Sequence, residues 1–501
     1  MAEGEVEEKV LSSYSLNAHG LPVEVRIVER GGFVPDYEVS FPGIGSATKL
    51  LLMSLRGELI TIVPVDSEKL GNKEYRDKLN QKYVEASNVL IDRYLPGTDA
   101  ETKKLLNSYV INIMLGLGDL EAPLADDSLE EITVNGAKDY IWVYHRKLGW
   151  CKTNIKPGSE ESIYEQAEQI GRNIGREINN LAPLMDAELS DGSRVNATLF
   201  PISQNGNTLT IRKFAKNPWT MTGLMKSGTI SANIAATVWL CIQNEISLLV
   251  AGGTASGKTS FLNAMSIFLP PNRRIISVEE TRELSLPSFL QWLQMLTRSP
   301  NPEGKGAVSL YDLMINALRQ RPDTIMIGEI RTVKDAETLF EAIHTGHSVY
   351  GTVHADNAQD TIIRMTNPPI SVPKIVINAL GAVIVQFRHR SKGIRRTFEF
   401  AEILRTGDAN VMYRWDVRED IFTQVSDMTR LSETLSLYAG LTKREIDQDV
   451  AEKSEVLNWM VKNNVVDVDN AGLVIANYYK NQSRVMDIVR SDIKYSEQLF
   501  R

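Results

Sequence analysis

The chain has 501 residues, 43% of them hydrophobic and 24% charged, and its formal net charge is −8. This length exceeds one ordinary domain, so we expect roughly two to four domains with substantial apolar cores. The acidic balance argues against general affinity for nucleic acid. The two cysteines, Cys151 and Cys241, exclude a disulfide framework and a CxxC zinc site, and they fit a reducing compartment.

The first third of the chain predicts mixed α and β structure. Short apolar or alternating runs predict strands at Pro22–Glu29, Asp36–Phe41 and Leu59–Val63. Apolar residues at helical spacing predict helices at Asn72–Tyr94 and Asp99–Leu115. We therefore expect an α+β region at the N-terminus.

Farther along, short strands are joined by Asn-Gly turns. Strands are predicted at Ile132–Val134 and Tyr140–Tyr144, and a helix at Glu160–Ile174. Leu199–Ile202 and Thr208–Arg212 are expected to pair as a hairpin. These elements indicate a second small α+β segment.

A joint at Ala215–Trp219 leads into a different pattern. After a predicted helix at Ile230–Asn244, apolar strands alternate with helices, which is typical of a parallel sheet covered on both faces. From Leu431 to Arg501 the pattern is mainly helical. The most apolar run, Ile375–Val385, is too short to span a bilayer. We expect membrane contact to come through a partner.

One basic run interrupts the acidic composition. Arg388–Lys392, together with Arg395 and Arg396, is a candidate for a local basic groove. A solvated turn beside a strand is the more common role of such a run, and we favour it here.

A glycine-rich loop stands between a predicted strand, Ser247–Val250, and a predicted helix. Gly252–Thr259 matches GxxxxGK(S/T), a pattern that arises by chance in roughly one or two chains per hundred of this length. The glycines permit a wrap in which backbone N–H groups point at phosphates. Lys258 is expected to reach the β- and γ-phosphates, and the Thr259 hydroxyl to ligate Mg²⁺. The residues expected to hold the nucleotide are Gly253, Thr254, Ala255, Ser256, Gly257, Lys258, Thr259 and Ser260.

Two acidic positions follow strands downstream of the loop. Arg274–Val278 leads to Glu280, and Thr324–Ile327 leads to Glu329. A carboxylate at such a strand end can hold Mg²⁺ or polarise the attacking water. Either alone is most often a solvated strand end, but two after one phosphate loop favour function. The usual Walker B aspartate is missing, since Asp323 precedes its strand.

Three histidines cluster at His344, His347 and His354, which suggests zinc at first. However, Ser348–Val353 predicts a strand, so His347 and His354 lie at its opposite ends and cannot easily share one metal. An imidazole that senses the γ-phosphate suits the spacing better. A structural role through satisfied hydrogen bonds is the alternative.

Four motifs in this order resemble those of the secretion and pilus-assembly ATPases, specifically the archaeal branch related to type II secretion, type IV pilus and archaellum motors. Gly252–Thr259 resembles Walker A, and Ile276–Glu283 resembles the acidic Asp box, with Glu280 in place of the usual aspartate. Leu318–Arg331 resembles the Walker B region, and Thr345–Ala355 the His box. The tetracysteine zinc insert of many bacterial relatives is absent, which favours the archaeal branch.

The resemblance covers roughly Leu129–Leu404, and Glu130–Gly136, Asp191–Asn196 and Leu209–Phe214 resemble the family's N-terminal domain. It implies an α/β fold: a RecA-like P-loop motor domain, a parallel sheet with helices on both faces, preceded by an α+β N-terminal region that includes a PAS-like domain. The implied domains are an α+β extension (1–118), a PAS-like domain covering the nucleotide (119–214), a linker (215–229), a RecA-like motor (230–430) and a C-terminal helical subdomain (431–501).

By motif match, Glu280 and Glu329 become candidates for water activation and, with Thr259, for Mg²⁺ contact; which glutamate does which stays open. Arg194 and Arg212 become candidates for arginines that neutralise charge on the γ-phosphate. The implied catalytic residues are Glu329, Glu280, Lys258, Arg194, Arg212, His347 and His354. Weaker candidates, because helix-end arginines commonly make surface ion pairs, are Arg319, Arg321 and Arg331.

The resemblance also implies the activity and its setting. ATP and Mg²⁺ are the expected cofactors, and hydrolysis of ATP to ADP and phosphate is expected to power secretion or assembly of type IV pilus-like filaments. The expected partners are copies of the chain in a hexameric ring, a polytopic membrane platform protein and the pilin or secretion machinery, with no nucleic acid. The expected location is the cytoplasmic face of the cell membrane.

Three alternatives remain. A nucleic-acid translocase on the same RecA-like core is disfavoured by the acidic net charge. A GTPase lacks the guanine-reading (N/T)KxD motif after the loop. A nucleotide-binding scaffold without turnover is disfavoured by the intact Lys258, Thr259, Glu329 and His354.

Overall fold

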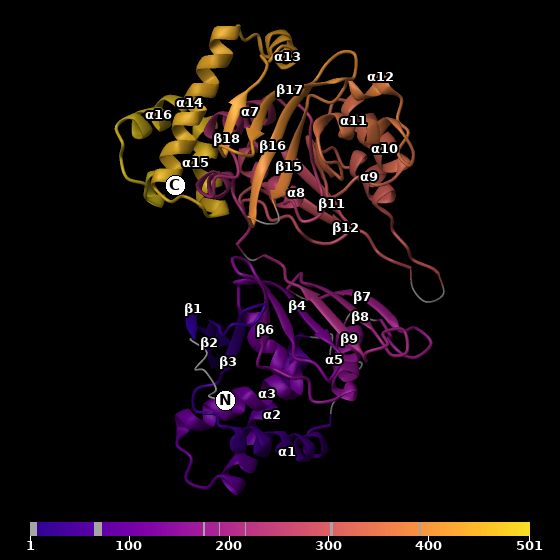
Figure 1. Cartoon of the computed structure of the whole chain (residues 1–501), viewed down its shortest axis with the longest axis vertical. Coiled ribbons are helices and arrows are strands. Elements are labelled where there is room, and N and C mark those ends of the chain that lie inside the picture. The colour runs from indigo at the N-terminus through magenta and orange to yellow at the C-terminus, as the bar shows by residue number, and fades with distance from the viewer. Residues whose placement is uncertain are drawn as a thin grey trace, which may run out of the picture. The chain divides into compact units, whose positions relative to one another are not determined.

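The computed structural model describes residues 8–64, 73–173, 176–189, 191–215, 217–300, 304–389 and 392–500. Outside these ranges lie six residues of the predicted segments: Asn72, Ile174, Lys216, Arg390, Ser391 and Arg501. The chain divides into two compact units, Met1–Lys216 and Asn217–Arg501. Each unit is built on its own nine-stranded sheet (Figure 1). None of the described helices has the length and apolar character needed to cross a membrane.

The sheet of the first unit has the strand order β1-β2-β3-β6-β5-β4-β9-β8-β7. Its strands are β1 (Lys9–Ala18), β2 (Leu21–Glu29), β3 (Asp36–Ser40), β4 (Leu129–Asn135), β5 (Trp142–His145), β6 (Gly149–Thr153), β7 (Leu184–Glu188), β8 (Arg194–Thr198) and β9 (Thr208–Arg212). Buried and exposed residues alternate along them, most clearly in β2, so one face is buried. Because β3 pairs with β6, strands expected in the α+β extension and in the PAS-like segment share this one sheet.

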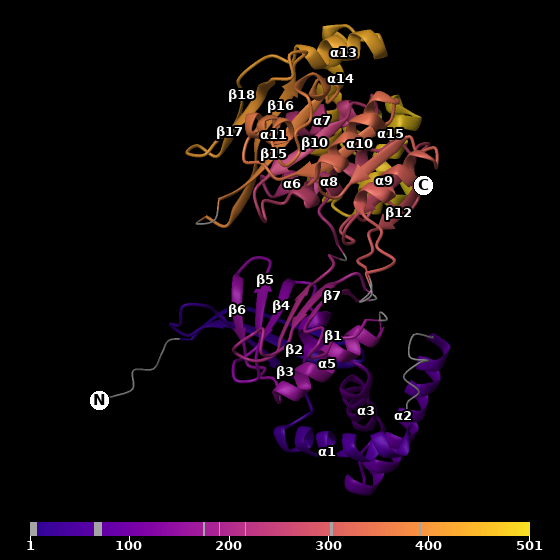
Figure 2. The same ribbon diagram turned by 90° about the vertical axis from the view of Figure 1, so that its right-hand side faces the viewer.

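The helices of the first unit pack with the sheet around one apolar core (Figure 2). They are α1 (Ser46–Ile62), α2 (Lys73–Tyr94), α3 (Ala100–Leu115), α4 (Glu121–Ala125) and α5 (Glu160–Asn173). The strand predicted at Leu59–Val63 is wrong, because residues 59–62 are the last residues of α1 and Val63 is its C-cap. Leu52, Leu55 and Leu59 recur at helical spacing and are buried together in the core, which outweighs the β-branched residues at this end of the helix.

The predicted hairpin of the first unit is wrong in one of its strands. β9 pairs antiparallel with β8, so that Thr208 lies opposite Thr198 and Arg212 opposite Arg194. Leu199–Ile202 lies in the connection instead. Pro201 has no N–H for a ladder, which disfavours a strand there.

The sheet of the second unit has the order β12-β11-β13-β14-β10-β15-β16-β17-β18. Its strands are β10 (Leu248–Gly252), β11 (Arg274–Glu279), β12 (Gln291–Leu296), β13 (Thr324–Ile327), β14 (Ser348–Val353), β15 (Ala382–His389), β16 (Ile394–Ile403), β17 (Ala409–Asp416) and β18 (Ile421–Gln424). The pairs from β12 to β15 are parallel, as the alternating pattern predicts. The last three strands add an antiparallel extension that the sequence pattern does not reveal.

Helices cover both faces of this sheet. Within β10, Leu248 and Val250 belong to one core cluster, and Leu249 and Ala251 to another. The first cluster includes residues of α7 (Ala232–Gln243), α8 (Lys258–Met265), α14 (Lys443–Lys462) and α15 (Val468–Lys480). The second includes residues of α9 (Leu310–Leu318), α10 (Val333–His344) and α11 (Ala358–Thr366). Burial on both faces explains why the central strands β10, β13 and β14 are continuous apolar or small-residue runs.

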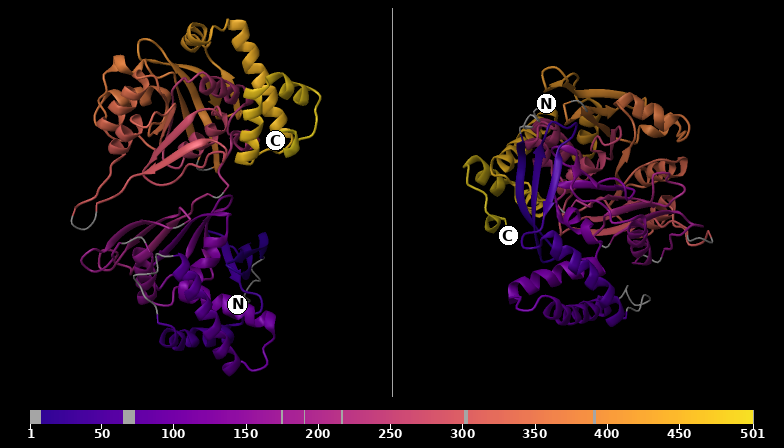
Figure 3. Two further views of the ribbon diagram at one scale, coloured as in Figure 1. Left: turned by 180° about the vertical axis from the view of Figure 1, so that it is seen from behind. Right: turned by 60° about the horizontal axis from the view of Figure 1, so that its bottom comes forward.

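The C-terminal helices pack on the second unit, where Figure 3 shows them side by side. They are α13 (Arg430–Ala439), α14, α15 and α16 (Gln482–Arg490), so the predicted helical end of the chain is confirmed. Trp239 of α7 stacks on Phe268 at 5.3 Å and meets the Tyr478 ring edge-on at 4.8 Å. The fully buried Lys453 lies 5.3 Å from both the Trp239 and Tyr478 rings and forms an ion pair with Asp449.

Candidate functional site

The glycine-rich loop joins β10 to α8 in a tight wrap that only glycine permits at two positions. A Cβ on Gly252 would lie 2.4 Å from Ser256 Oγ and 2.5 Å from the Gln386 carbonyl oxygen. Gly257 begins α8 in the left-handed region, with φ 95°. The backbone geometry of the loop therefore requires glycine at both Gly252 and Gly257.

The first turn of α8 is open to an anion. Among the described residues no side chain caps this terminus, and the turn carries no acidic residue, so its N–H groups and positive dipole end are available. Lys258 lies in this turn, and its Nζ donates to the Gly253 carbonyl oxygen at 3.0 Å. Burial lowers the pKa of Lys258, and the carboxylates of Glu329 and Glu283 oppose that shift. These residues fit a nucleotide phosphate, which would give the ammonium group an anionic partner.

The two predicted glutamates lie at the same edge of the sheet as the loop. Glu280 directly follows β11 and Glu329 follows β13, and these strands are parallel neighbours. Arg331 joins the two: its Nη1 donates to Glu280 Oε2 at 2.6 Å, and its Nε and Nη2 donate to Glu329 Oε2 at 3.1 and 2.8 Å. The Glu280 and Glu329 side chains are 41% and 27% exposed. They can therefore meet Mg²⁺, which typically keeps several waters and takes one or two carboxylates plus phosphate oxygens.

A third glutamate, Glu279, has a different environment from its neighbour Glu280. Its carboxylate is buried and accepts hydrogen bonds from the backbone N–H groups of Glu283 and Leu284 at 2.8 and 2.9 Å. Gln294 donates to its other oxygen at 2.9 Å. Burial raises the pKa of Glu279. Glu279 thus holds the turn that presents Glu280.

The two predicted histidines are not brought together. β14 pairs with β10 so that Val353 lies opposite Ala251, which places His354 at the loop edge of the sheet. His347 precedes β14, about 20 Å away along the strand. Its Nδ1 lies 3.1 Å from the Ala342 carbonyl oxygen and 3.0 Å from Thr345 Oγ1. Of these two histidines, His354 shares the edge with the glycine loop and His347 does not.

Comparison with known proteins identifies the family. Residues 120–391, more than half of the chain, match the family described as Type II/IV secretion system protein. The chain belongs to this family. The matched stretch contains the glycine loop, both glutamates and both histidines. The family resemblance carried by the motifs is confirmed, as is the mixed α/β fold.

Relatives of this secretion-family protein span much of its length. An uncharacterised protein of Methanocaldococcus jannaschii is 31% identical over 490 residues, covering 92% of this chain and 88% of the relative. The Type IV secretion system protein PtlH of Bordetella pertussis is 29% identical over 306 residues, covering 54% of this chain and 89% of the relative. Among solved structures, the Legionella pneumophila ATPase DotB shares 18% identity at a TM-score of 0.42, covering 74% of this chain and 94% of DotB.

Two predicted arginines of this secretion-family protein lie in the first unit. Arg194 of β8 and Arg212 of β9 are directly opposite each other in the sheet. Arg194 is held by Asp186, to which its Nε and Nη2 donate at 2.9 and 2.6 Å. The role of Arg194 and Arg212 toward a nucleotide stays a prediction.

Two further residues contact the loop and are absent from the sequence-based site. Asp356 Oδ1 lies 3.2 Å from where a Cβ on Gly253 would be. Arg395 Nε donates to the Ala255 carbonyl oxygen at 3.1 Å. Asp356 stands only two residues after His354, a signal that could have found it. Arg395 belongs to the basic run for which a solvated turn was favoured.

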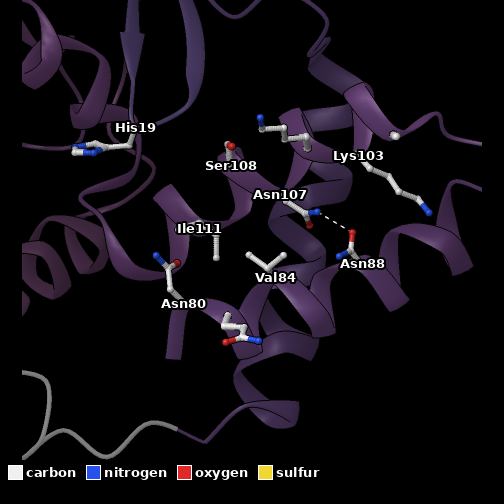
Figure 4. A pocket seen from close by; sticks show the side chains of 11 residues that line it. His19, Asn80, Val84, Asn88, Lys103, Asn107, Ser108 and Ile111 are labelled. Atoms are coloured by element: carbon white, nitrogen blue, oxygen red, sulfur yellow. Dashed lines mark hydrogen bonds between the residues drawn. The ribbon is translucent and has the colours of Figure 1, made fainter. Parts of the chain in front are cut away.

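A separate cavity of about 600 Å³ lies in the first unit, between α2 and α3. Figure 4 shows Asn80 and Val84 on one side and Asn107 and Ile111 on the other. Asn107 Nδ2 donates to Asn88 Oδ1 at 2.8 Å. None of its lining residues belongs to the site predicted from the secretion-family motifs.

Proposed function

We propose that this protein is a Mg²⁺-dependent ATPase that acts as a motor for secretion or for assembly of type IV pilus-like filaments. The observation that carries the proposal is the meeting of the glycine loop, Lys258, Glu280 and Glu329 at one edge of a parallel sheet. Membership of the Type II/IV secretion system protein family supports it. A relative named Type IV secretion system protein PtlH supports a function in secretion.

In the proposed reaction, water attacks the γ-phosphorus of ATP and ADP leaves. The N–H groups of α8 and the Lys258 ammonium group bind the phosphates, and Thr259 with the glutamates would hold Mg²⁺. When bound, the metal ion would supply positive charge that offsets the negative charge of the phosphates. Glu329 is the proposed base for water, because it follows β13, which lies nearer to β10 and its glycine loop in the sheet than β11, the strand before Glu280. His354, at the same edge, is proposed to sense the γ-phosphate, whereas His347 is left out of the set.

Other parts of the proposal rest on family resemblance. The 230–430 segment is proposed to be a RecA-like motor and the 119–214 segment a PAS-like domain. Arg194 and Arg212 are proposed to supply positive charge to the transition state. Six copies are proposed to form a ring at the cytoplasmic face of the membrane, where a polytopic platform protein receives the motion.

Phosphate release from ATP and Mg²⁺ tests the catalytic part. Wild type should turn over, Lys258→Ala should lose nucleotide binding, and Glu329→Gln should bind ATP without hydrolysing it. The matched control is Glu337→Gln, an exposed glutamate of α10, which should behave as wild type. Absence of turnover in the wild-type protein would overturn the motor hypothesis.

Light scattering with a non-hydrolysable ATP analogue tests the ring. The expected result is six times the mass of one chain. A persistent monomer under the same conditions contradicts the hexamer while leaving the ATPase activity to be judged by phosphate release.

A further inference from the structure

The β15–β16 hairpin brings an arginine to the glycine loop. Arg395, the second residue of β16, donates from Nε to the Ala255 carbonyl oxygen at 3.1 Å. Its Cδ lies 3.6 Å from the position that a Cβ on Gly257 would occupy. Two contacts to successive parts of one short loop place the guanidinium group beside the backbone that binds a phosphate.

Arg395 differs sharply from its neighbour on the same strand. The Arg396 guanidinium binds Asp420 through two hydrogen bonds of 2.7 and 2.8 Å, and it lowers the pKa of that carboxyl to about 2. Arg395 forms no ion pair with any carboxylate in the described part of the chain, and of its guanidinium nitrogens only Nε has a hydrogen-bond partner there. A guanidinium group carries five N–H donors in a planar fork. Arg395 therefore has donors left for a ligand, whereas Arg396 is committed to Asp420.

The loop segment that Arg395 contacts is conformationally strained. Ala255 adopts φ 58°, in the left-handed region that non-glycine residues rarely occupy. Ala255 is also exposed, so its carbonyl needs a partner from outside the loop to stay fixed. The bond from Arg395 supplies that partner and holds the guanidinium plane at the loop. This arrangement orients the remaining donors before any nucleotide arrives.

We propose that Arg395 binds the phosphates that ATP and ADP share, as a second cation beside Lys258. The inference rests on the proposed function, because it takes the glycine loop to bind a nucleotide. A guanidinium group stays charged and matches phosphate oxygens through paired hydrogen bonds, which suits it to this role. Arg395 lies beyond residues 120–391, so the match to the family assigns it no role.

Titration of the full chain with fluorescent mant-ADP, in the presence of Mg²⁺, measures the effect. Arg395→Ala should raise the Kd of ADP and of a non-hydrolysable ATP analogue by the same factor, roughly tenfold or more, as for one lost hydrogen bond to a charged group. Arg395→Lys should keep part of the affinity because the charge remains. The matched control is Arg405→Ala, an arginine that is 71% exposed and pairs with Glu433; it should leave the Kd unchanged.

Arg395→Gln separates direct contact from loop support, because glutamine can still donate to the Ala255 carbonyl but has no charge. Weak binding by Arg395→Gln is expected. Wild-type affinity in Arg395→Gln or in Arg395→Ala overturns the proposal, and so does a loss restricted to the ATP analogue. Failure of the wild-type protein to bind mant-ADP is a different result, since it overturns the proposed function itself.

Discussion

Replacing Arg331 with alanine tests whether the bridge between Glu280 and Glu329 matters for catalysis or only for the fold. The three side chains are 53%, 41% and 27% exposed, in the order Arg331, Glu280 and Glu329. Ion pairs this exposed contribute roughly 0.2–1 kcal/mol each. We therefore expect Arg331→Ala to lower the free energy of unfolding by only about 1 kcal/mol.

Arg331→Ala should affect the Mg²⁺ requirement of ATP turnover more than it affects the free energy of unfolding. Because Arg331 hydrogen-bonds both carboxylates, a divalent cation held by them would stand about 6 Å from the guanidinium group. In a water-like dielectric the two would repel each other by about 1.4 kcal/mol, a factor of roughly ten. Removing the arginine also leaves Glu280 and Glu329 without their shared counter-ion. The Mg²⁺ concentration for half-maximal ATP turnover should therefore fall roughly tenfold.

Maximum turnover should also fall, although Mg²⁺ binds more tightly. Arg331 donates all the side-chain hydrogen bonds that the Glu329 carboxylate accepts in the described structure, and misplacing a reacting group by about 1 Å can cost roughly a hundredfold in rate. We expect kcat to fall between about tenfold and a hundredfold. Arg331→Lys should keep the wild-type Mg²⁺ requirement, because the charge remains, but lose turnover, because one ammonium group cannot hold both carboxylates in the same way.

Steady-state phosphate release over a Mg²⁺ series at saturating ATP, combined with urea unfolding, provides both readouts. Arg405→Ala serves as the control for removal of an exposed, ion-paired arginine. Unchanged turnover together with an unchanged Mg²⁺ requirement in Arg331→Ala would refute the reasoning, because it would reduce the bridge to a surface ion pair. A loss of several kcal/mol in stability would instead make Arg331 a structural residue.

Three further outcomes are expected. In urea unfolding, Asp449→Asn should lower the free energy of unfolding by about 3 kcal/mol, because it leaves the buried Lys453 without its carboxylate partner. Adding Lys453→Met should restore most of the lost stability, and a double variant as unstable as Asp449→Asn contradicts this explanation. Gly252→Ala should lower the free energy of unfolding by about 1–3 kcal/mol and abolish mant-ADP binding, because its Cβ would meet the Gln386 backbone. The control Gly57→Ala, with open space around it, should keep both stability and binding. Binding retained by Gly252→Ala would be inconsistent with the loop geometry. Burial and Asp126 raise the pKa of Tyr37, so the folded state keeps the phenol proton at a pH where the unfolded chain loses it. The free energy of unfolding should therefore fall as pH rises above about 10. Tyr37→Phe should make this fall less steep between about pH 9 and 11, and an unchanged dependence on pH contradicts the role given to Tyr37.

Local sequence patterns were sufficient for the parts of the fold in which neighbouring residues decide the structure. The apolar runs of β10, β11, β13 and β14 and the glycine spacing of the loop have their cause within a few residues. The prediction at Leu59–Val63 failed because burial across α1 outweighed the local preference of its last residues. β16, β17 and β18 were missed because their burial follows no common local period: the last five residues of β16 are all buried, whereas β18 has no buried residue. Their pairing is antiparallel and outside the repeating strand–helix pattern.

The sequence by itself determined the phosphate loop and the family, and that Glu280 and Glu329 follow strands. Only the tertiary structure decided that β11 and β13 are neighbours, so that Arg331 bridges the two glutamates. It also placed His354 at the same sheet edge as the glycine loop and brought Arg395 to a carbonyl 140 residues away in the chain. Strand order and such contacts depend on pairing between distant segments, which no local spacing of residues records.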